Sequence, residues 1–263
     1  MEDQLIYVYC ISDNHLQLPY FAGAENLKNL LYGKFSAIVK EVSHAEFSEE
    51  NLRKNFADLP WIELHARDHI RIITEVMKDR AVIPFKFGTI FLSAESLGQF
   101  VADYADSLSE NLNNTKGKEE WSVKIYVNKA ILNGQIGVIS QDVRNLENEI
   151  AVSMPGKAFL LKRKKVELIE TEVQRELQRC GQSCYEDLSI LSALTRLNNI
   201  LPREVTERTD DMILNLSCFV TYEKIDQFLH VIDQLQEKYQ SVGFDINAAG
   251  PWPPFSFTSI KEK

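Results

Sequence analysis

Two histidines one helical turn apart are the first residues whose spacing could support chemistry. His65 and His69 lie in the string HARDH and would share one face of a helix. The string is close to the inverted zinc-protease pattern H-x-x-E-H, but Asp68 stands where that pattern needs glutamate. His69 also falls on an apolar helical stripe, and the sequence offers no evident third ligand. We therefore predict packed or partly exposed histidines and no metal site.

The cysteines repeat the same spacing without completing a site. Cys180 and Cys184 are four residues apart, whereas Cys10 and Cys218 are isolated. A structural zinc site needs two close pairs, so buried small hydrophobic side chains are the better interpretation. The N-terminus has no signal-peptide pattern, and we expect reduced thiols in the cytoplasm.

A basic cluster follows a chain break at Met154-Pro155-Gly156. Gly156-Lys157 is similar to part of a phosphate loop, but Ala151 and Ala158 occupy positions that need glycine and Ser or Thr. The cluster consists of Lys157, Lys162, Arg163, Lys164 and Lys165. A solvated helix face is the simplest interpretation, and binding to an acidic partner surface is the alternative. No nucleotide fingerprint or nucleophile motif occurs, which disfavours an enzyme, although a catalytic group assembled from distant residues would leave no such motif. We expect no cofactor. The competing hypothesis is an enzyme that binds a small acidic or phosphorylated ligand near Lys157–Lys165.

The C-terminal segment Gly250–Phe257, GPWPPFSF, combines three prolines with three aromatic residues. The prolines stiffen the chain, and the rings offer a large apolar area at low entropic cost. The tail could pack across a sheet as a clamp or form a preformed docking surface, and the two are compatible. We expect Trp252 to be buried between the domains or against the second sheet.

Composition limits the class of protein. The chain has 263 residues, of which 44% are hydrophobic and 25% charged, with a net charge of -9. These values exclude wholesale disorder and disfavour non-specific nucleic-acid binding. No apolar run reaches the roughly 20 residues of a membrane span, so we expect a cytoplasmic protein with one or two domains.

The elements of the N-terminal half centre on Ala81–Phe91, AVIPFKFGTIF, whose apolar density predicts a central buried strand. Pro84 should lie at an edge or bulge, and Gly88 should mark a bend. An amphipathic helix over Trp61–Asp79 precedes this strand, and a helix capped by Ser93 follows it.

The remaining ranges predict strands at 5–11 and 35–42 and a short helix at 25–32 ended by Gly33. The polar linker 113–118 then suggests an N-terminal α+β domain over 1–117 and a C-terminal domain over 118–263.

The second half predicts strand, helix, strand, strand, helix and strand. The predicted strands are 121–128, 189–197, 212–221 and 243–249, and the helices run from 156 to about 184 and over 225–239. This order is that of a ferredoxin-like split βαβ fold, with 129–155 as an insertion. The segment 189–197 is ambiguous: if it is helical, the sheet loses a strand.

Four segments together resemble one family. They are IPFKFGTIF (Ile83–Phe91), MPGKAFLLKRK (Met154–Lys164), MILNLSCFV (Met212–Val220) and GPWPPFSF (Gly250–Phe257). In this order, and over nearly the whole chain, they are similar to the gas vesicle accessory proteins F and L. Phe255 replaces the usual tyrosine of the last motif. Lys86 stands where the family often has arginine, so the positive charge is retained.

The resemblance implies a non-enzymatic minor component of the gas vesicle that helps the hydrophobic shell protein assemble. It also implies two α+β domains, the second a modified ferredoxin-like fold, and we favour F over L. The expected partners are the shell protein and other gas vesicle accessory proteins. Our candidate partner-binding residues are Phe85, Lys86, Phe87, Lys157, Lys162, Arg163, Lys164, Trp252, Phe255 and Phe257.

Overall fold

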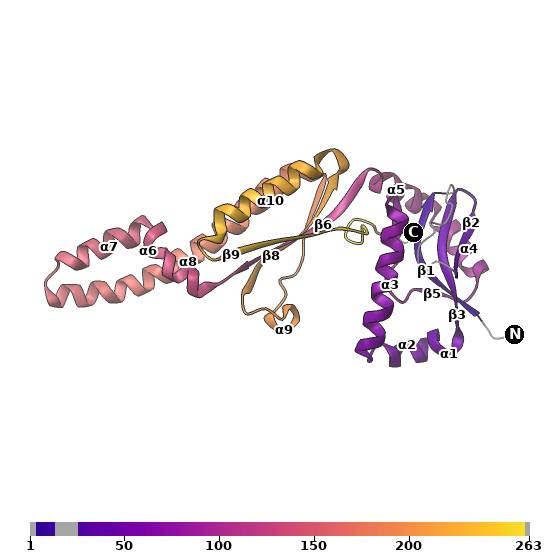
Figure 1. Ribbon diagram of the computed structural model, residues 1–263, viewed down its shortest axis with the longest axis horizontal. Helices are drawn as coiled ribbons and strands as arrows, with labels where there is room; N and C mark the ends of the chain where they lie inside the picture. The colour runs from indigo at the N-terminus through magenta and orange to yellow at the C-terminus, as the bar shows by residue number, and fades with distance from the viewer. Residues whose placement is uncertain (1–3, 14–25, 261–263) are drawn as a thin grey trace. The chain divides into compact units, whose positions relative to one another are not determined.

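The computed structural model describes residues 4–13 and 26–260 (Figure 1). Contacts divide the chain into two compact units, of which the first combines Met1–Glu120 with Pro251–Lys263 and the second is Trp121–Gly250. The tail therefore groups with the first unit, whereas we expected it in the C-terminal domain. Each unit mixes helices with a sheet.

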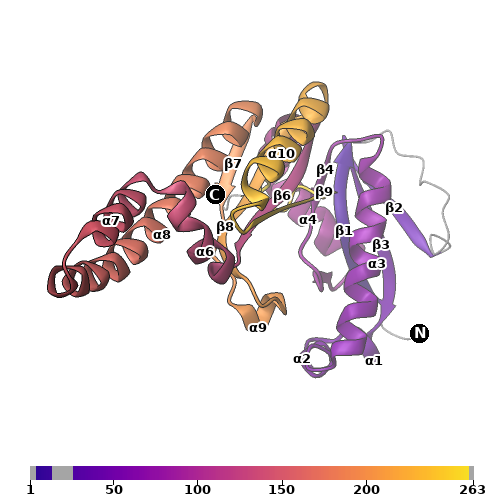
Figure 2. The same cartoon turned by 60° about the vertical axis from the view of Figure 1, so that its left-hand side comes forward.

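The central strand of the first unit is β1 (Gln4–Asp13), and the sheet order is β2-β3-β1-β4 with β5 also paired to β1. The other strands are β2 (Leu27–Tyr32), β3 (Phe35–Ser43), β4 (Val82–Pro84) and β5 (Ile90–Phe91). Tyr7 and Tyr9 join a core cluster with residues of α3 (Leu59–Met77). Ile6 and Val8 join another with α4 (Ala94–Asp103) and α5 (Ala105–Thr115). Because alternate residues of β1 serve the two clusters, helices cover both faces of the sheet, and Figure 2 shows α3 lying along one of them.

The prediction of one central strand over Ala81–Phe91 is wrong. The segment forms β4 and β5, and β1 is central instead. Cys10 pairs with Pro84 and Tyr7 with Ile90, so residues 85–89 stand opposite only Val8 and Tyr9. The Phe85 N–H donates to the Tyr9 carbonyl at 2.9 Å and the Val8 N–H to the Thr89 carbonyl at 3.1 Å, and the chain bulges out between these two bonds. Gly88 has φ +80°, a left-handed conformation that interrupts a regular strand. Pro84 lies in the edge strand β4, as predicted.

The predicted short helix at 25–32 is also wrong within the described residues. Leu27–Tyr32 is strand β2, which pairs with β3 so that Tyr32 faces Phe35. Gly33, which we interpreted as a helix stop, has φ +59° in the tight turn of this hairpin. Residue 25 lies outside the described residues.

The helix predictions of this unit are mostly confirmed. Helix α3 has Pro60 in its first turn, and Ser93 caps α4 with a reciprocal bond to Ser96. The helix after Ser93 breaks at Tyr104 into α4 and α5, which the sequence pattern did not predict. Two short helices, α1 (His44–Phe47) and α2 (Glu49–Asn55), precede α3.

The second unit has a four-stranded sheet in the order β7-β8-β6-β9. Its strands are β6 (Lys118–Val127), β7 (Leu194–Leu197), β8 (Asp211–Thr221) and β9 (Phe244–Trp252). Its helices are α6 (Lys129–Ile139), α7 (Gln141–Val152), α8 (Pro155–Leu191), α9 (Arg203–Thr206) and α10 (Ile225–Gln240). Val123, Ile125 and Val127 alternate into one core with side chains of α8 and α10.

The ambiguous segment 189–197 is divided between two elements. Helix α8 continues to Leu191, and only Leu194–Leu197 forms a strand, which pairs with β8. The sheet therefore keeps its fourth strand. The expected insertion 129–155 forms α6 and α7, and α7 packs against the first half of α8 as a helical hairpin.

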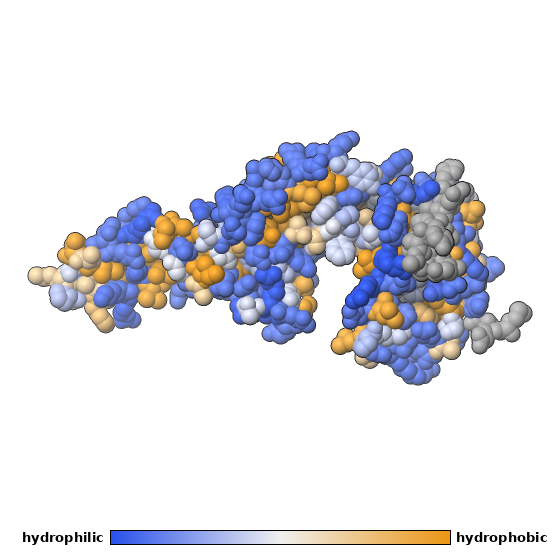
Figure 3. All heavy atoms as spheres, in the orientation of Figure 1, coloured by the Kyte–Doolittle hydropathy of each residue, from blue (hydrophilic) through white to orange (hydrophobic). Residues whose placement is uncertain are grey.

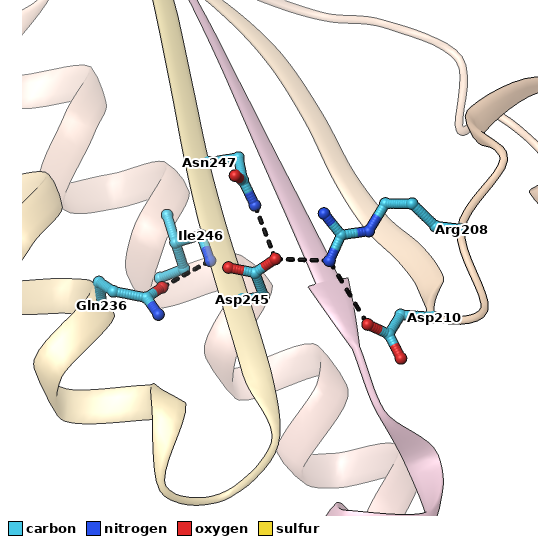
Figure 4. Close-up of polar contacts among 6 residues, drawn as sticks. All are labelled: Arg208, Asp210, Gln236, Asp245, Ile246 and Asn247. Atoms are coloured by element: carbon cyan, nitrogen blue, oxygen red, sulfur yellow. Dashed lines mark hydrogen bonds and ion pairs between the residues drawn. The ribbon is translucent and has the colours of Figure 1, made fainter.

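A polar network fastens the loop after α9 to the sheet (Figure 4). Arg208 donates to Asp245 of β9 at 2.5 Å and to Asp210 at 3.4 Å. Its guanidinium also lies 4.1 Å from the centre of the Tyr126 ring. Asn247 donates to the same Asp245 oxygen at 2.8 Å, so this carboxylate accepts from two donors.

No helix among the described residues is long and apolar enough to span a membrane.

Candidate functional site: an aromatic platform in the first unit

His69 is the buried centre of an aromatic group in the first unit. Its side chain is almost completely buried on α3, with both ring nitrogens hydrogen-bonded. The Tyr7 hydroxyl lies 2.8 Å from Nδ1, and the Phe85 carbonyl oxygen lies 2.9 Å from Nε2. The Gly88 N–H in turn donates to the Tyr7 hydroxyl oxygen at 3.3 Å. These bonds tie together β1, α3 and the bulge at 85–89.

The partners of His69 specify a neutral imidazole. The Phe85 carbonyl can only accept, so Nε2 donates and Nδ1 accepts from the Tyr7 hydroxyl. An imidazolium would need Tyr7 to accept twice, which would leave the hydroxyl proton without its partner. Burial lowers the pKa of His69, and the Phe85 bond and the nearby Asp68 charge oppose that shift. His69 is thus a structural hydrogen-bonding residue, which agrees with the prediction of a packed histidine.

The bulge presents its side chains in three different ways. Phe85 is buried in the core beside α4, Lys86 is exposed, and Phe87 is half-buried. The Phe87 ring centre lies 5.9 Å from that of His69, 6.0 Å from Trp61 and 5.7 Å from Phe56. Phe87 therefore connects the buried histidine with rings nearer the surface.

The tail adds a further ring to this group. Phe255 stacks on His69 at a centroid distance of 6.4 Å and an interplanar angle of 27°. Ser256 donates from its backbone N and its hydroxyl to Glu120, at 2.9 and 2.5 Å. Asn111 of α5 exchanges two bonds with the backbone of Ser259, at 3.0 and 3.1 Å. These contacts hold the tail on the first unit with Phe255 over His69.

We name this group the aromatic platform and define it as Tyr7, Phe56, Trp61, His69, Phe87 and Phe255. Its outer members, Phe56 and Phe255, are 44% and 37% exposed. In the platform, buried hydrogen bonds fix His69 and Tyr7, while the outer rings of Phe56 and Phe255 are open to solvent.

The expectation that Trp252 is buried is wrong, because its side chain is 40% exposed. It is the last residue of the edge strand β9, whose residues from Asn247 onward are all exposed. The buried residues of the tail are Pro253 and Pro254 instead. Phe257 is half-buried.

The basic cluster belongs to the second unit. Lys157 pairs with Glu149 of α7 at 2.8 Å, and Lys165 pairs with Glu147 at 2.6 Å. The bond from Lys157 is the main cause that lowers the pKa of Glu149. These two lysines therefore join α7 to α8, while Lys162, Arg163 and Lys164 are exposed.

A small hollow beside the platform is lined in part by Tyr7, Tyr9, Glu46, His65 and Asp68 and has a volume of about 230 Å³. This is below the 300–1,000 Å³ typical of small-molecule sites. Two of its titratable groups also contact each other, with His65 Nε2 3.5 Å from Glu46. The hollow therefore has the character of a packing gap more than that of an active site.

Metal-ligating arrangements are missing from the described ranges 4–13 and 26–260, where no three His, Cys, Asp or Glu side chains are placed to share an ion. His65 stacks on Trp61 at 4.0 Å, so it is not directed toward His69. The four cysteines are free and buried, as predicted for small hydrophobic side chains. Burial raises the pKa of Cys218 to about 11.

Sequence reasoning identified Phe87 and Phe255 but missed Tyr7, Phe56 and Trp61. These rings are scattered over β1, the end of α2 and α3, and only the fold brings them together. One signal was available: a histidine on an apolar helical stripe needs buried hydrogen-bond partners.

Comparisons with known proteins agree over nearly the whole chain. The family model "Gas vesicle synthesis protein GvpL/GvpF" matches residues 5–259. Gas vesicle protein L of Streptomyces sp. (strain CB03234) is 23% identical, covering 99% of this chain and 95% of the relative. Gas vesicle protein F1 of Halobacterium salinarum is 26% identical, covering 97% and 93%.

Solved structures share the fold. The crystal structure of the gas vesicle protein GvpF from Anabaena sp. PCC7120 superposes with a TM-score of 0.70 at 16% identity, covering 98% of this chain and 100% of that one. GvpF from Microcystis aeruginosa gives a TM-score of 0.65 at 18% identity, covering 97% and 98%. With the family model matched from β1 to the tail, this chain belongs to the GvpL/GvpF family of gas vesicle synthesis proteins.

Proposed function

We propose that this protein is a gas vesicle assembly factor and minor structural component that binds the hydrophobic shell protein and limits its aggregation during nucleation. Family membership supports the gas vesicle role. The observation that carries the binding role is the aromatic platform, in which exposed rings stand on a rigid buried base.

The physical argument rests on preorganisation. A shell subunit with exposed apolar surface needs cover until it joins a growing edge. Phe56 and Phe255 offer such cover, and their positions are fixed through Phe87 and His69 before any partner arrives. Ordering costs on binding are therefore small. The net charge of -9 keeps the carrier itself from aggregating.

Within the candidate set we assign Phe255 and Phe87 to the centre of the contact, because both rings pack against His69. We assign Lys86 to its charged edge, because it is exposed next to Phe87. Phe85 supports the bulge from within the core, because only 8% of it is exposed. Trp252 and Phe257 stay in the proposed set as neighbours of Phe255 along the tail.

The test is a turbidity assay with purified shell protein and a pull-down in parallel. Wild-type protein should bind the shell protein and slow its aggregation, whereas Phe255→Ser and Phe56→Ser should each lose at least half of that effect. Leu92→Ser is the matched control, because Leu92 is an exposed apolar residue of the same unit outside the platform. Thermal melts establish that each variant is folded.

Two results would contradict the proposal. One is wild-type protein that neither binds the shell protein nor changes its aggregation. The other is a Leu92→Ser variant as defective as Phe255→Ser, because that result would assign the effect to general surface hydrophobicity. Immunoblotting of washed vesicles separates a retained structural component from a transient chaperone.

We further infer that residues 118–263 contain a modified ferredoxin-like domain with α6 and α7 as its insertion. The chain order strand, helix, strand, strand, helix, strand and the sheet order β7-β8-β6-β9 support it. A crystal structure with another strand order would contradict this assignment.

We place the protein in the cytoplasm on forming gas vesicles, with other gas vesicle accessory proteins as further partners, and we favour F over L. Free buried cysteines fit a reducing compartment. Fractionation of cells with an antibody against this chain tests the location.

A further inference from the structure

The turn between α7 and α8 exposes an unusual amount of apolar surface. Val152 and Met154, on either side of the turn, are 86% and 82% exposed. Phe159 and Leu160, in the first turns of α8, are exposed as well. Figure 3 shows orange patches over this hairpin of the second unit. We name the four residues the hairpin tip.

The hairpin extends beyond the core of its unit. From Glu147 to Glu172 no residue is buried, and the nearest buried side chains are Leu146 on α7 and Val173 on α8. An apolar helical face is ordinarily stabilised by burial against another element. Within the described residues nothing of this unit covers the tip, so its apolar side chains are available to a partner.

The same part of α8 carries positive charge. Phe159, Arg163 and Val166 recur at i, i+4 and i+7 and therefore lie on one exposed face, about 10 Å long at 1.5 Å per residue. Lys162 and Lys164 flank this face. The adjacent Lys157 and Lys165 pair with glutamates of α7, which links the two helices of the hairpin.

We propose that the hairpin tip is a docking site for an acidic amphipathic helix of a partner protein. The apolar residues of that helix cover Phe159 and Leu160, and its carboxylates pair with Lys162, Arg163 and Lys164. Charge complementarity carries the choice of occupant, since Lys162, Arg163 and Lys164 are exposed together while the ion pairs of the hairpin involve Lys157 and Lys165. The site is distinct from the aromatic platform and does not rest on the proposed function.

Other occupants fit less well. Two copies meeting tip to tip in a symmetric dimer would bring Lys162, Arg163 and Lys164 of both chains together, and like charges repel. An anionic lipid surface is a plane, whereas the exposed residues of the tip lie along one narrow helical ridge. A narrow ridge suits a helix better than a plane.

The experiment measures the fluorescence anisotropy of a labelled synthetic helix with the full-length protein. The peptide has about 18 residues, with leucines at i, i+3, i+4 and i+7 and glutamates on the remaining face. It should bind, and its affinity should fall as salt rises. A peptide with lysine in place of glutamate should bind at least tenfold more weakly.

Variants locate the binding surface. Phe159→Ser with Leu160→Ser, and separately Arg163→Glu with Lys164→Glu, should each weaken peptide binding at least tenfold. Ile190→Ser is the matched control, because Ile190 is an exposed apolar residue near the other end of the same helix. All variants should melt like wild type, because the altered side chains are exposed.

Several outcomes overturn the proposal. They are equal binding of the lysine peptide, an Ile190→Ser variant as weak as the tip variants, and no binding of the glutamate peptide at low salt. Sedimentation that shows a dimer lost on changing Phe159 and Leu160 would make the occupant a second copy. Tip-dependent binding to vesicles of anionic lipid, without peptide binding, would assign the tip to a membrane surface.

Discussion

Removing the Tyr7 hydroxyl group, which bonds to the buried His69 of the aromatic platform, should destabilise the first unit. Tyr7→Phe deletes the donor to His69 Nδ1 and the acceptor for the Gly88 N–H, which now lie 2.8 and 3.3 Å from that oxygen. Tyr7 and His69 are buried, so water cannot easily replace the lost partner. A buried group left unsatisfied costs about 1–3 kcal/mol, and we expect a loss in that range.

Urea unfolding at pH 7.5 measures the loss, with Tyr9→Phe as the matched control. Tyr9 is equally buried on the same strand, but its hydroxyl makes no hydrogen bond within the described part of the chain. Its replacement should therefore cost well under 1 kcal/mol. If Tyr7→Phe and Tyr9→Phe lower the free energy of unfolding equally, the hydrogen bond between Tyr7 and His69 does not stabilise the platform. The argument that the rings are preorganised then fails.

Three further predictions concern the same surroundings. Because the pKa of His69 is lowered in the folded state, the unfolded chain takes up a proton on this side chain first as pH falls below about 6.5. The free energy of unfolding should then drop by up to about 1.4 kcal/mol per pH unit. In urea unfolding measured from pH 7.5 to 5, His69→Gln should remove that part of the slope. Gly88→Ala should lower the free energy of unfolding by about 1–2 kcal/mol, because Gly88 has φ +80° and a Cβ there would lie 2.7 Å from Cζ of Phe56. An unchanged free energy would mean that the bulge adopts another conformation. Trp252→Ala should cost less than the 3–5 kcal/mol of a core tryptophan, because the side chain is 40% exposed, and a thermal melt showing a loss in that range would mean that Trp252 is buried in solution.

Local patterns predicted the elements that local chemistry determines. Helix α3 follows from its apolar stripe and Pro60, and the start of α4 follows from the Ser93 cap. Strand β8 follows from a dense run of β-branched and aromatic residues. These signals lie within a few residues of each other, so no knowledge of the rest of the fold is needed.

The errors arose where distant pairing decides the conformation. Leu27–Tyr32 has a sequence compatible with a short helix, but it pairs along β3 and becomes a strand. Ala81–Phe91 has the composition of one strand, yet β1 pairs with its two ends, and residues 86–88 bulge out between the last bonds on either side. The apolar composition of Ala81–Phe91 predicts a buried strand, but it does not indicate where the pairing with β1 is interrupted.

The site was half predictable for the same reason. Phe87 and Phe255 belong to motifs that stand out in the sequence, whereas Tyr7 lies in a run predicted only as a strand and Phe56 lies in no motif. His69 joins three of them directly, because Nδ1 bonds to Tyr7 and its ring packs against Phe87 and Phe255. Phe56 is joined to the group through Phe87 and Trp61. A buried polar group at the centre of an aromatic set is specified by three-dimensional partners, which no local pattern encodes.

The two proposed surfaces lie in different units and are supported differently, so a variant of one should not impair binding at the other. The aromatic platform belongs to the first unit, and its rings are positioned by a buried hydrogen-bond network. The hairpin tip belongs to the second unit, and its side chains are exposed because the hairpin extends past the last buried residues. Phe255→Ser should consequently impair the shell-protein assay and leave peptide binding intact, while Phe159→Ser with Leu160→Ser should do the reverse. If each variant impaired both assays to the same degree, a single surface or a shared folding defect would explain them, and the separation into two docking sites would be wrong.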